Sequence, residues 1–160
     1  MAAGKNAADS LDAMTLPGLK EVRQSPGYLI RRAHQQATAA YVAELGSGQI
    51  TGVQFVALVA VAEEGGLSGT VVADRIGYDK MTTSHVLRRL ERKALIERRT
   101  SLTDRRETLI FATPAGREIV AEVNERLGAV SEKLFRGLDP VEATTLLTIL
   151  SKMETLARRG

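Results

Sequence analysis

The chain has 160 residues and a net charge of +3, with 44% hydrophobic and 26% charged residues, as expected for one domain with an apolar core. Cysteine is absent and only His34 and His85 represent histidine, which excludes disulfides, thiol redox chemistry and cysteine metal sites; we expect no metal and no cofactor. No run of about 18 apolar residues occurs, so we expect no membrane span and a cytoplasmic protein.

The chain begins with a segment, residues 1–24, that we interpret as a flexible leader. Its start is small and polar and lacks the apolar core of a secretion signal. Residues 25–48 are predicted to form an N-terminal dimerisation helix, because apolar side chains recur at helical spacing from about Tyr28 onward. Pro26 lies at the start of this helix and Gly46 at its end.

Three helices are predicted in the middle of the chain from their capping residues. A capping box of Thr51 and Gln54 starts the first of them. Ser68 caps the second helix, which Gly77 stops, and Asp79 caps the third. The second and third helices are joined by a tight turn, and this arrangement is typical of a helix-turn-helix.

A β-hairpin is predicted directly after the helix-turn-helix. Its strands are residues 96–100, in which apolar and charged side chains alternate, and residues 108–112. A polar, charged loop joins the two strands. A hairpin in this position is a wing, so residues 49–113 are interpreted as a winged helix-turn-helix DNA-binding domain.

Residues 114–160 are predicted to form two C-terminal dimerisation helices, with starts at Pro114 and Pro140. Apolar residues cover more than one face of the last helix: Leu146, Leu147, Ile149 and Leu150. A second copy of the chain is the simplest partner for this surface, and the alternative is packing onto the same chain. The predicted fold class is mainly α with a small β-hairpin wing: a winged helix-turn-helix core flanked by N- and C-terminal dimerisation helices.

Positive charge is concentrated in residues 75–106. This stretch contains ten Lys and Arg residues against four Asp and Glu residues, a net charge of +6, so the rest of the chain carries −3. A basic stretch in an otherwise slightly acidic protein is typical of a nucleic-acid surface. The alternative is a solvated charged face.

A helical wheel of residues 80–94 separates a side expected in the core from a side expected to face outward. The inward side comprises Thr83, Val86, Leu87, Leu90 and Ala94. The outward side comprises Met81, Ser84, His85, Arg88 and Arg92, with Thr82 and Arg89 at its edge. The outward face therefore combines long cations with short hydroxyls and an imidazole.

The outward side chains divide into base-reading and phosphate-binding candidates. The N-terminal part of a recognition helix reaches bases, so base reading is assigned to Thr82, Ser84, His85 and Arg88. Contacts with phosphates are assigned to Lys80, Arg89, Arg92 and Lys93. The alternatives are that Thr82 is only a first-turn residue and that Arg92 and Lys93 are solvated.

Four segments together resemble the MarR family of transcriptional regulators, over about residues 28–158. They are Asp79-Lys80-Met81-Thr82-Thr83-Ser84, Leu90-Glu91-Arg92-Lys93-Ala94-Leu95-Ile96, Asp104-Arg105-Arg106 and Ala112-Thr113-Pro114-Ala115-Gly116. The resemblance implies a homodimer on a pseudo-palindromic operator, with recognition helices in major grooves and wing tips in minor grooves. One departure is Ala94, where the family commonly has glycine; a positive φ would be strained there, so we expect a differently built turn.

The resemblance also assigns roles to the wing residues. Arg106 matches the wing arginine of the family, and an Arg on a hairpin tip suits the negative potential of a narrow minor groove. Asp104 matches the acid that holds the wing in place, for which a local salt bridge is the expected role. Arg105 is also assigned to DNA, where its expected contact is a phosphate. The alternative is that Arg105 makes no contact.

The first long helix carries candidate effector-binding residues, since members of the family are often released from DNA by phenolic or aromatic-acid ligands. His34 shares a face with Tyr41, and Arg31 and Thr38 lie at its edge. An imidazole and a guanidinium beside an apolar stripe suit an aromatic carboxylate. The alternative is a core histidine bonded to a backbone carbonyl, with Arg31 in a dimer salt bridge.

No catalytic residues are assigned, because the sequence has no cysteine nucleophile, phosphate-binding glycine loop, GxSxG or HExxH motif. The aromatic residues do not cluster on the basic stretch, which disfavours single-strand or RNA binding. We therefore interpret the chain as a non-enzymatic, dimeric, sequence-specific repressor of double-stranded DNA, released by a small aromatic ligand. The alternatives are a non-specific architectural DNA-binding protein and a helical protein-interaction dimer without an effector.

Overall fold

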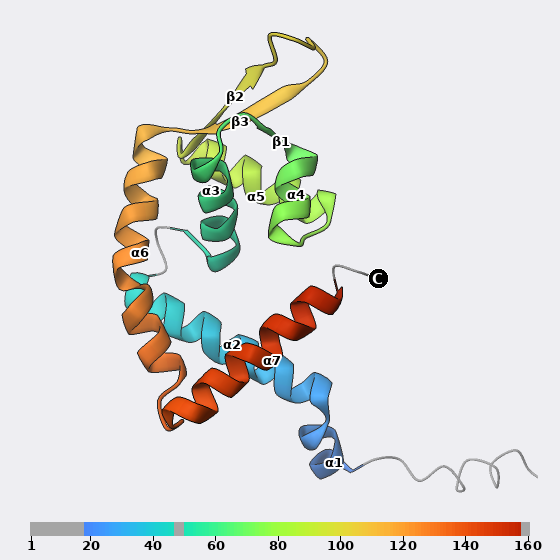
Figure 1. Ribbon diagram of the computed structural model, residues 1–160, viewed down its shortest axis with the longest axis vertical. Coiled ribbons are helices and arrows are strands. Elements are labelled where there is room, and N and C mark those ends of the chain that lie inside the picture. Colours follow the sequence, from blue (N-terminus) through green and yellow to red (C-terminus); the bar gives the residue numbers. More distant parts are fainter. Residues whose placement is uncertain (1–17, 47–49, 158–160) are drawn as a thin grey trace, which may run out of the picture. The chain divides into compact units, whose positions relative to one another are not determined.

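The computed structural model describes residues 18–46 and 50–157 (Figure 1). The chain divides into two compact units, residues 1–36 and 37–160, with the boundary inside a helix. The first unit contains α1 (Leu19–Gln24) and the beginning of α2 (Pro26–Leu45). The prediction of a flexible leader is therefore wrong for residues 19–24, which form a helix. The segment contains good helix formers, and Glu21 in its first turn and Arg23 in its last turn suit the helix dipole. Residues 1–17 of the expected leader lie outside the described residues.

The second unit contains the end of α2 and all later elements. They are α3 (Gly52–Glu63), β1 (Leu67–Ser68), α4 (Gly69–Ile76), α5 (Lys80–Arg92), β2 (Ile96–Thr100), β3 (Thr108–Ala112), α6 (Pro114–Leu134) and α7 (Pro140–Ala157). The predicted mainly helical, winged helix-turn-helix fold is confirmed. The short strand β1 was not predicted, because two residues carry no recognisable periodicity.

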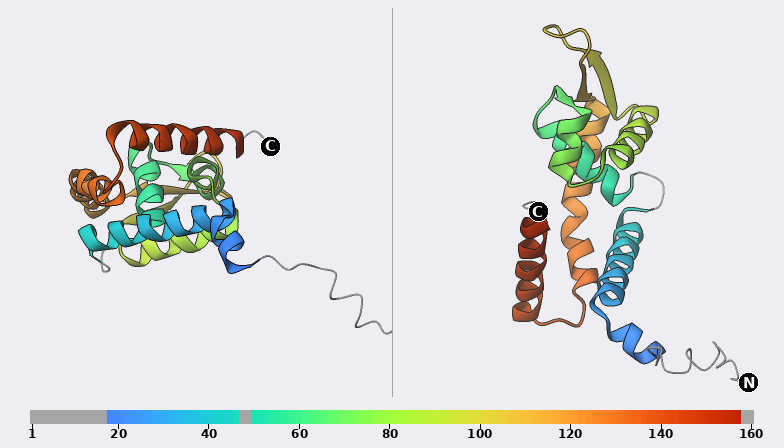
Figure 2. Two further views of the ribbon diagram at one scale, coloured as in Figure 1. Left: turned by 90° about the horizontal axis from the view of Figure 1, so that it is seen from below. Right: turned by 90° about the vertical axis from the view of Figure 1, so that its right-hand side faces the viewer.

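The three strands form an antiparallel sheet in the order β1-β3-β2. In the hairpin, Ile96 lies opposite Ala112 and Thr100 lies opposite Thr108. The hairpin projects away from the helices of the winged helix-turn-helix, as Figure 1 and the right-hand view of Figure 2 show. Pairing of Leu67 with Ile110 ties the start of α4 to the wing, so the helix-turn-helix and the hairpin share one sheet.

The helix ends follow the predicted caps. The side chain of Thr51 accepts from the backbone N–H of Gln54, whose own side chain accepts from the backbone N–H of Thr51. Ser68 accepts from the backbone N–H of Val71 at the start of α4. Gly77 ends α4 in the left-handed region, with φ of 68°, which glycine adopts without steric cost.

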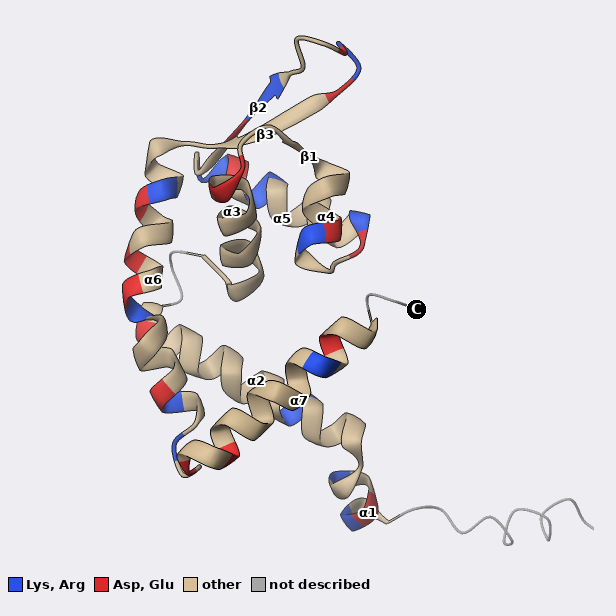
Figure 3. Ribbon diagram, in the orientation of Figure 1, with Lys and Arg blue, Asp and Glu red and all other residues tan. Residues whose placement is uncertain are grey.

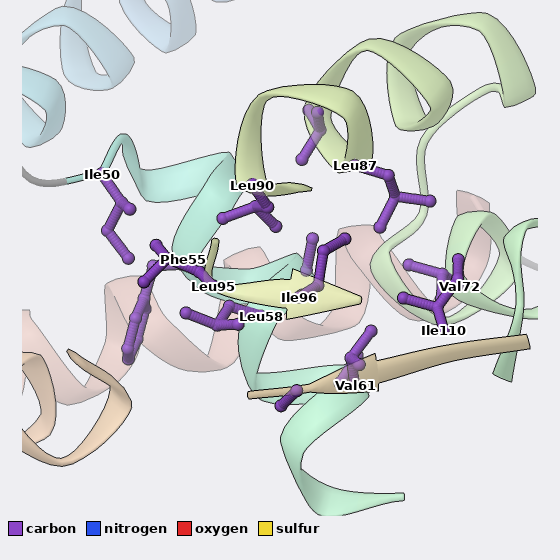
Figure 4. Packing of buried hydrophobic residues seen from close by; sticks show 14 of the residues in the cluster. Ile50, Phe55, Leu58, Val61, Val72, Leu87, Leu90, Leu95, Ile96 and Ile110 are labelled. Atoms are coloured by element: carbon purple, nitrogen blue, oxygen red, sulfur yellow. The ribbon is translucent and has the colours of Figure 1, made fainter. Parts of the chain in front are cut away.

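The hydrophobic core surrounds α3, which contacts α4, α5, α6 and β3 (Figure 4). Leu58 and Val61 of α3 are fully buried, and they meet side chains from the helix-turn-helix and from the sheet. The partners labelled in Figure 4 include Val72, Leu87, Leu90, Ile96 and Ile110. Full burial of one such side chain contributes about 1.5–3 kcal/mol, so this cluster fixes how α5 is presented.

Helix α6 is anchored to the end of α2 by polar contacts inside the second unit. Arg126 donates to the backbone carbonyl of Glu44 at 3.2 Å, and Lys133 forms an ion pair with the Glu44 carboxylate. None of the residues of α7 is buried, and its apolar side chains Leu146, Leu147, Ile149 and Leu150 are 38–51% exposed. Of the helices that the structure describes, none has the length and apolarity needed to cross a bilayer.

Candidate nucleic-acid interface

The orientation of α5 is fixed by its buried face, which leaves the opposite face exposed. Thr83, Val86, Leu87 and Leu90 are 0–6% exposed, as the wheel predicted. Lys80, Ser84, His85, Arg88, Arg89 and Arg92 are exposed, and Thr82 is half-buried. Ala94 was expected in the core and is instead exposed, because α5 ends at Arg92 and Ala94 lies in the following turn.

The turn after α5 has the left-handed conformation despite its alanine. The φ of Ala94 is 55°, the only positive φ of a non-glycine residue among the described residues. The expectation of a differently built turn is therefore wrong. The hydrogen bonds that hold the turn include one from the backbone N–H of Leu95 to the Leu90 carbonyl and one from the Thr113 hydroxyl to the Ala94 carbonyl at 2.8 Å.

Lysine and arginine are frequent on α5, β2 and the tip of the hairpin (Figure 3). A cavity of about 380 Å³ lies between the wing and the helix-turn-helix. Its polar lining includes Lys80, Ser84, Arg98 and Arg106 with the hydroxyls of Ser68, Thr70 and Thr108. The fold thus brings three predicted site residues, Lys80, Ser84 and Arg106, into one concave surface. Arg98, Ser68 and Thr70 were missed, because their proximity depends on the pairing of β1 with β3.

A second cavity, of about 430 Å³, lies where α5 ends beside the start of α3. It is lined by Ile50, Thr51, Gln54, Arg89, Arg92 and Lys93. Three residues predicted to contact phosphate therefore surround one hollow. The N-terminus of α3 adds the partial positive charge of a helix dipole, so this surface attracts anions.

The loop at the tip of the wing is held by hydrogen bonds to its backbone. The Asp104 carboxylate accepts the backbone N–H of Arg106 at 2.9 Å, and the backbone N–H of Glu107 donates to the Asp104 carbonyl. The buried Ser101 hydroxyl oxygen lies 3.3 Å from the backbone nitrogen atoms of Thr103 and Asp104, which donate to it.

Asp104 thus stabilises the wing, but the salt bridge expected of it is absent from the described residues: its partner is a peptide N–H and not a guanidinium. The reason is local, because an aspartate in a turn readily bonds the backbone two residues on. The side chains of Arg105 and Arg106 are both exposed beside it.

The root of the wing is joined to α5 by an ion pair. Arg98 on β2 donates through Nε to the Glu91 carboxylate at 3.0 Å. The neighbouring Arg99 pairs with Glu97, and its guanidinium lies 4.7 Å from the centre of the Phe111 ring. The pair of Arg98 with Glu91 joins β2 to the helix that carries the base-reading candidates, whereas the contacts of Arg99 lie within the hairpin.

The four effector-binding candidates all lie on α2. Arg31, whose guanidinium is 5.1 Å from the centre of the Tyr28 ring, belongs with His34 to the first unit, and both side chains are exposed in the single chain. Thr38 is exposed in the second unit. The Tyr41 hydroxyl is buried without a hydrogen-bond partner among the described residues, and burial raises its pKa.

A cavity of about 360 Å³ between α3 and α6 was not predicted. Its lining is Phe55, Val59, Ala62, Glu63, Arg117, Val120 and Asn124. Arg117 donates to the carbonyl of Ala62 at 2.8 Å, which holds its cationic end beside this apolar surface. No sequence pattern could indicate it, because the two helices that form it are far apart in the chain.

Comparison with known proteins gives consistent matches. The profile of the MarR family matches residues 49–107. The HTH-type transcriptional repressor NicR of Pseudomonas putida is 26% identical over 133 residues, which cover 83% of this chain and 84% of NicR. BpsR of Bordetella bronchiseptica, whose DNA binding is regulated by 6-hydroxynicotinic acid, is 30% identical, with a TM-score of 0.76, 82% of this chain and 94% of that chain covered. A mutant of Escherichia coli MarR complexed with operator DNA shares the fold, with 23% identity, a TM-score of 0.75, and 86% and 99% of the two chains covered.

Proposed function

This chain belongs to the MarR family of transcriptional regulators, and on that premise we propose that it is a homodimeric repressor that reads a pseudo-palindromic operator. Regulators of this family are DNA-binding proteins and not enzymes. The observation that carries the proposal is the concave surface between wing and recognition helix, where Lys80, Ser84, Arg98 and Arg106 converge.

Each part of this surface has a distinct task in the proposal. Ser84, His85 and Arg88 on the exposed face of α5 read base edges in the major groove, where Arg can bond guanine through two donors. The cavity of Arg89, Arg92 and Lys93 receives backbone phosphate, which adds affinity without sequence preference. Lys80 and Arg105 add further phosphate contacts.

The wing places Arg106 in the adjacent minor groove, where a narrow groove concentrates negative potential. Hydrogen bonds that the side chains of Asp104 and Ser101 accept from backbone N–H groups order the loop before DNA arrives, so less conformational freedom is lost on binding. The ion pair between Glu91 and Arg98 keeps the wing in register with α5. The fold therefore sets the distance between the wing and the recognition helix α5, which together contact one half-site in this proposal.

Dimerisation follows from the exposed apolar face of α7, for which a second copy of the chain is the proposed partner. A two-fold dimer places two recognition helices about one helical turn of DNA apart, roughly 34–36 Å. The operator is accordingly an inverted repeat, and neither half-site alone binds tightly.

A small aromatic acid or phenol is proposed to release the repressor. The proposed binding residues are Arg31, His34, Thr38 and Tyr41 on α2. The Tyr41 hydroxyl, which has no hydrogen-bond partner among the described residues, would donate to a carboxylate or phenol oxygen of the ligand. The regulation of BpsR by 6-hydroxynicotinic acid supports this ligand class. If Tyr41→Phe leaves operator affinity unchanged but abolishes release by every aromatic acid tested, the assignment holds; unchanged release contradicts it.

The test of the main proposal is selection from a library of random duplexes, with the enriched sequences read out. We expect an inverted repeat whose binding is lost in Arg88→Ala and in Arg106→Ala. Binding should be kept in Arg136→Ala, which changes an exposed arginine in the turn between α6 and α7. Binding without enrichment would favour a non-specific architectural protein. No duplex binding by a folded protein would favour a helical interaction module.

A further inference from the structure

An apolar side chain stands exposed on the recognition helix. Met81, the second residue of α5, is 72% exposed, whereas Val86, Leu87 and Leu90 of the same helix are buried. Exposure of so large an apolar side chain contributes nothing to folding. Its surroundings on the helix are polar, since Ser84 and His85 lie three and four residues further on and share its face.

The major groove of DNA offers one apolar group to a side chain at this place, the C5-methyl of thymine. We propose that Met81 is a specificity-determining residue that packs against a thymine methyl in each half-site. The inference rests on the proposed function, because it assumes that the exposed face of α5 enters the major groove. The base itself would be selected by shape, without a hydrogen bond.

Two properties of Met81 fit this task. Residues in the first turns of a recognition helix reach the base edges, and Met81 precedes Ser84, His85 and Arg88 on that helix. The side chain is unbranched, flexible and polarisable, so it can follow the surface of a methyl group whose depth in the groove varies. Neighbouring Lys80 lines the concave surface beside the wing. A phosphate contact of Lys80, as proposed above, would restrict how the helix can turn in the groove.

The test uses the duplex enriched by the wild-type protein and a set of variants of it in which each thymine is replaced by deoxyuridine, which lacks only the methyl group. Affinity is measured for the wild type and for Met81→Ala. We expect one symmetry-related position at which deoxyuridine weakens wild-type binding about three- to tenfold, as for loss of one methyl contact. Met81→Ala should bind both duplexes equally.

Two further variants separate methyl recognition from general effects. Met81→Leu keeps an apolar contact and should keep much of the discrimination, whereas Leu102→Ala, which truncates a fully exposed leucine at the wing tip, should keep all of it. Equal melting temperatures of the wild type and Met81→Ala would show that folding is unaffected.

The outcomes distinguish this inference from the function on which it rests. Specific operator binding with no sensitive thymine, or with the same sensitivity in Met81→Ala, overturns the role of Met81 and leaves the regulator intact. If the wild type enriches no sequence, the proposed function and the role of Met81 both fail.

Discussion

The Asp79 carboxylate binds both donors of Thr82: one oxygen accepts the backbone N–H at 2.8 Å, and the other accepts the hydroxyl at 2.6 Å. These bonds cap α5 and lock its first turn. They also engage the Thr82 hydroxyl, which had been predicted to read a base. Base reading by hydrogen bonds is therefore expected mainly from Ser84, His85 and Arg88.

The same pair predicts how stability responds to acid. Hydrogen bonds from Thr82 lower the pKa of Asp79 from its usual 3.8. Because the folded pKa lies below the unfolded one, this stabilisation is present above pH 3.8 and is lost as the pH falls through the folded pKa. In thermal unfolding, Asp79→Asn should melt below the wild type at neutral pH, and the difference should shrink under strongly acidic conditions.

Thr82→Ser is the matched control, since it keeps a hydroxyl on the carboxylate and should reproduce the acid response of the wild type. Thr82→Val should weaken that response. A melting difference between Asp79→Asn and the wild type that stays constant with pH would contradict the assignment.

The neighbouring Thr83 predicts a stabilising substitution. Its side chain is 1% exposed, and its hydroxyl has no hydrogen-bond partner among the described residues. Thr83→Val replaces the hydroxyl with a methyl of similar shape, so the free energy of unfolding should rise by about 1 kcal/mol in chemical denaturation. Thr83→Ala leaves a cavity and should not stabilise; a destabilised valine variant would show that the hydroxyl has a partner.

Local signals in the sequence accounted for most of the fold. Caps such as Thr51, Ser68 and Asp79 act within three residues, so the helix starts could be predicted from short segments. The prediction that Ala94 lies in the core was wrong. The helical wheel assumed that α5 continues to Ala94, whereas this residue has a left-handed conformation and lies beyond the end of the helix.

The candidate site was only partly predictable. Individual cations of α5 were found from charge and spacing, and those of the wing from the resemblance to the MarR family. The cavities were not, because each joins distant segments, as when Thr51 meets Arg92 or Ser68 meets Arg106. These residues are close together because of how α3 packs and how the strands pair. Neither can be predicted from a single sequence.

The strain at Ala94 predicts that glycine would be better there. A left-handed conformation costs an alanine about 1–2 kcal/mol, and the greater freedom of glycine in the unfolded chain offsets about 0.5–1 kcal/mol of the gain. Ala94→Gly should therefore raise the free energy of unfolding slightly, by about 0.5–1 kcal/mol. A clear loss of stability would mean that the alanine methyl makes a contact worth more than the strain.

Gly116 in α6 is predicted to tolerate no side chain. A Cβ there would overlap the carbonyl oxygen of Leu95 and lie 3.2 Å from a methyl of Leu58, so the turn after α5 would have to shift. Gly116→Ala should destabilise the fold by about 1–3 kcal/mol. Gly128→Ala is the control in the same helix: its Cβ meets nothing within 4 Å, so it should stabilise by up to about 1 kcal/mol. Similar effects of the two alanines would contradict the close approach.

The apolar face of α7 makes the last prediction, on assembly. At about 100° per residue, Ile149 and Met153 fall within this face, whereas Thr144 and Thr148 fall on the polar side of the helix. All four side chains are exposed in the single chain, so glutamates at either pair should leave the fold of the protomer intact. A dimer that buries the apolar face would bury four charges in the Ile149→Glu/Met153→Glu double variant, two from each protomer.

Loss of that burial should weaken association more than about 1,000-fold, since each apolar side chain contributes about 1.5–3 kcal/mol when buried. Sedimentation velocity should then find a monomer for Ile149→Glu/Met153→Glu and a dimer for Thr144→Glu/Thr148→Glu at the same spacing. Circular dichroism should be alike for both, because α7 itself remains helical. If the first variant stays dimeric, α7 does not supply the interface; if it is monomeric yet binds the full operator as tightly as the wild type, the two half-sites are not read together.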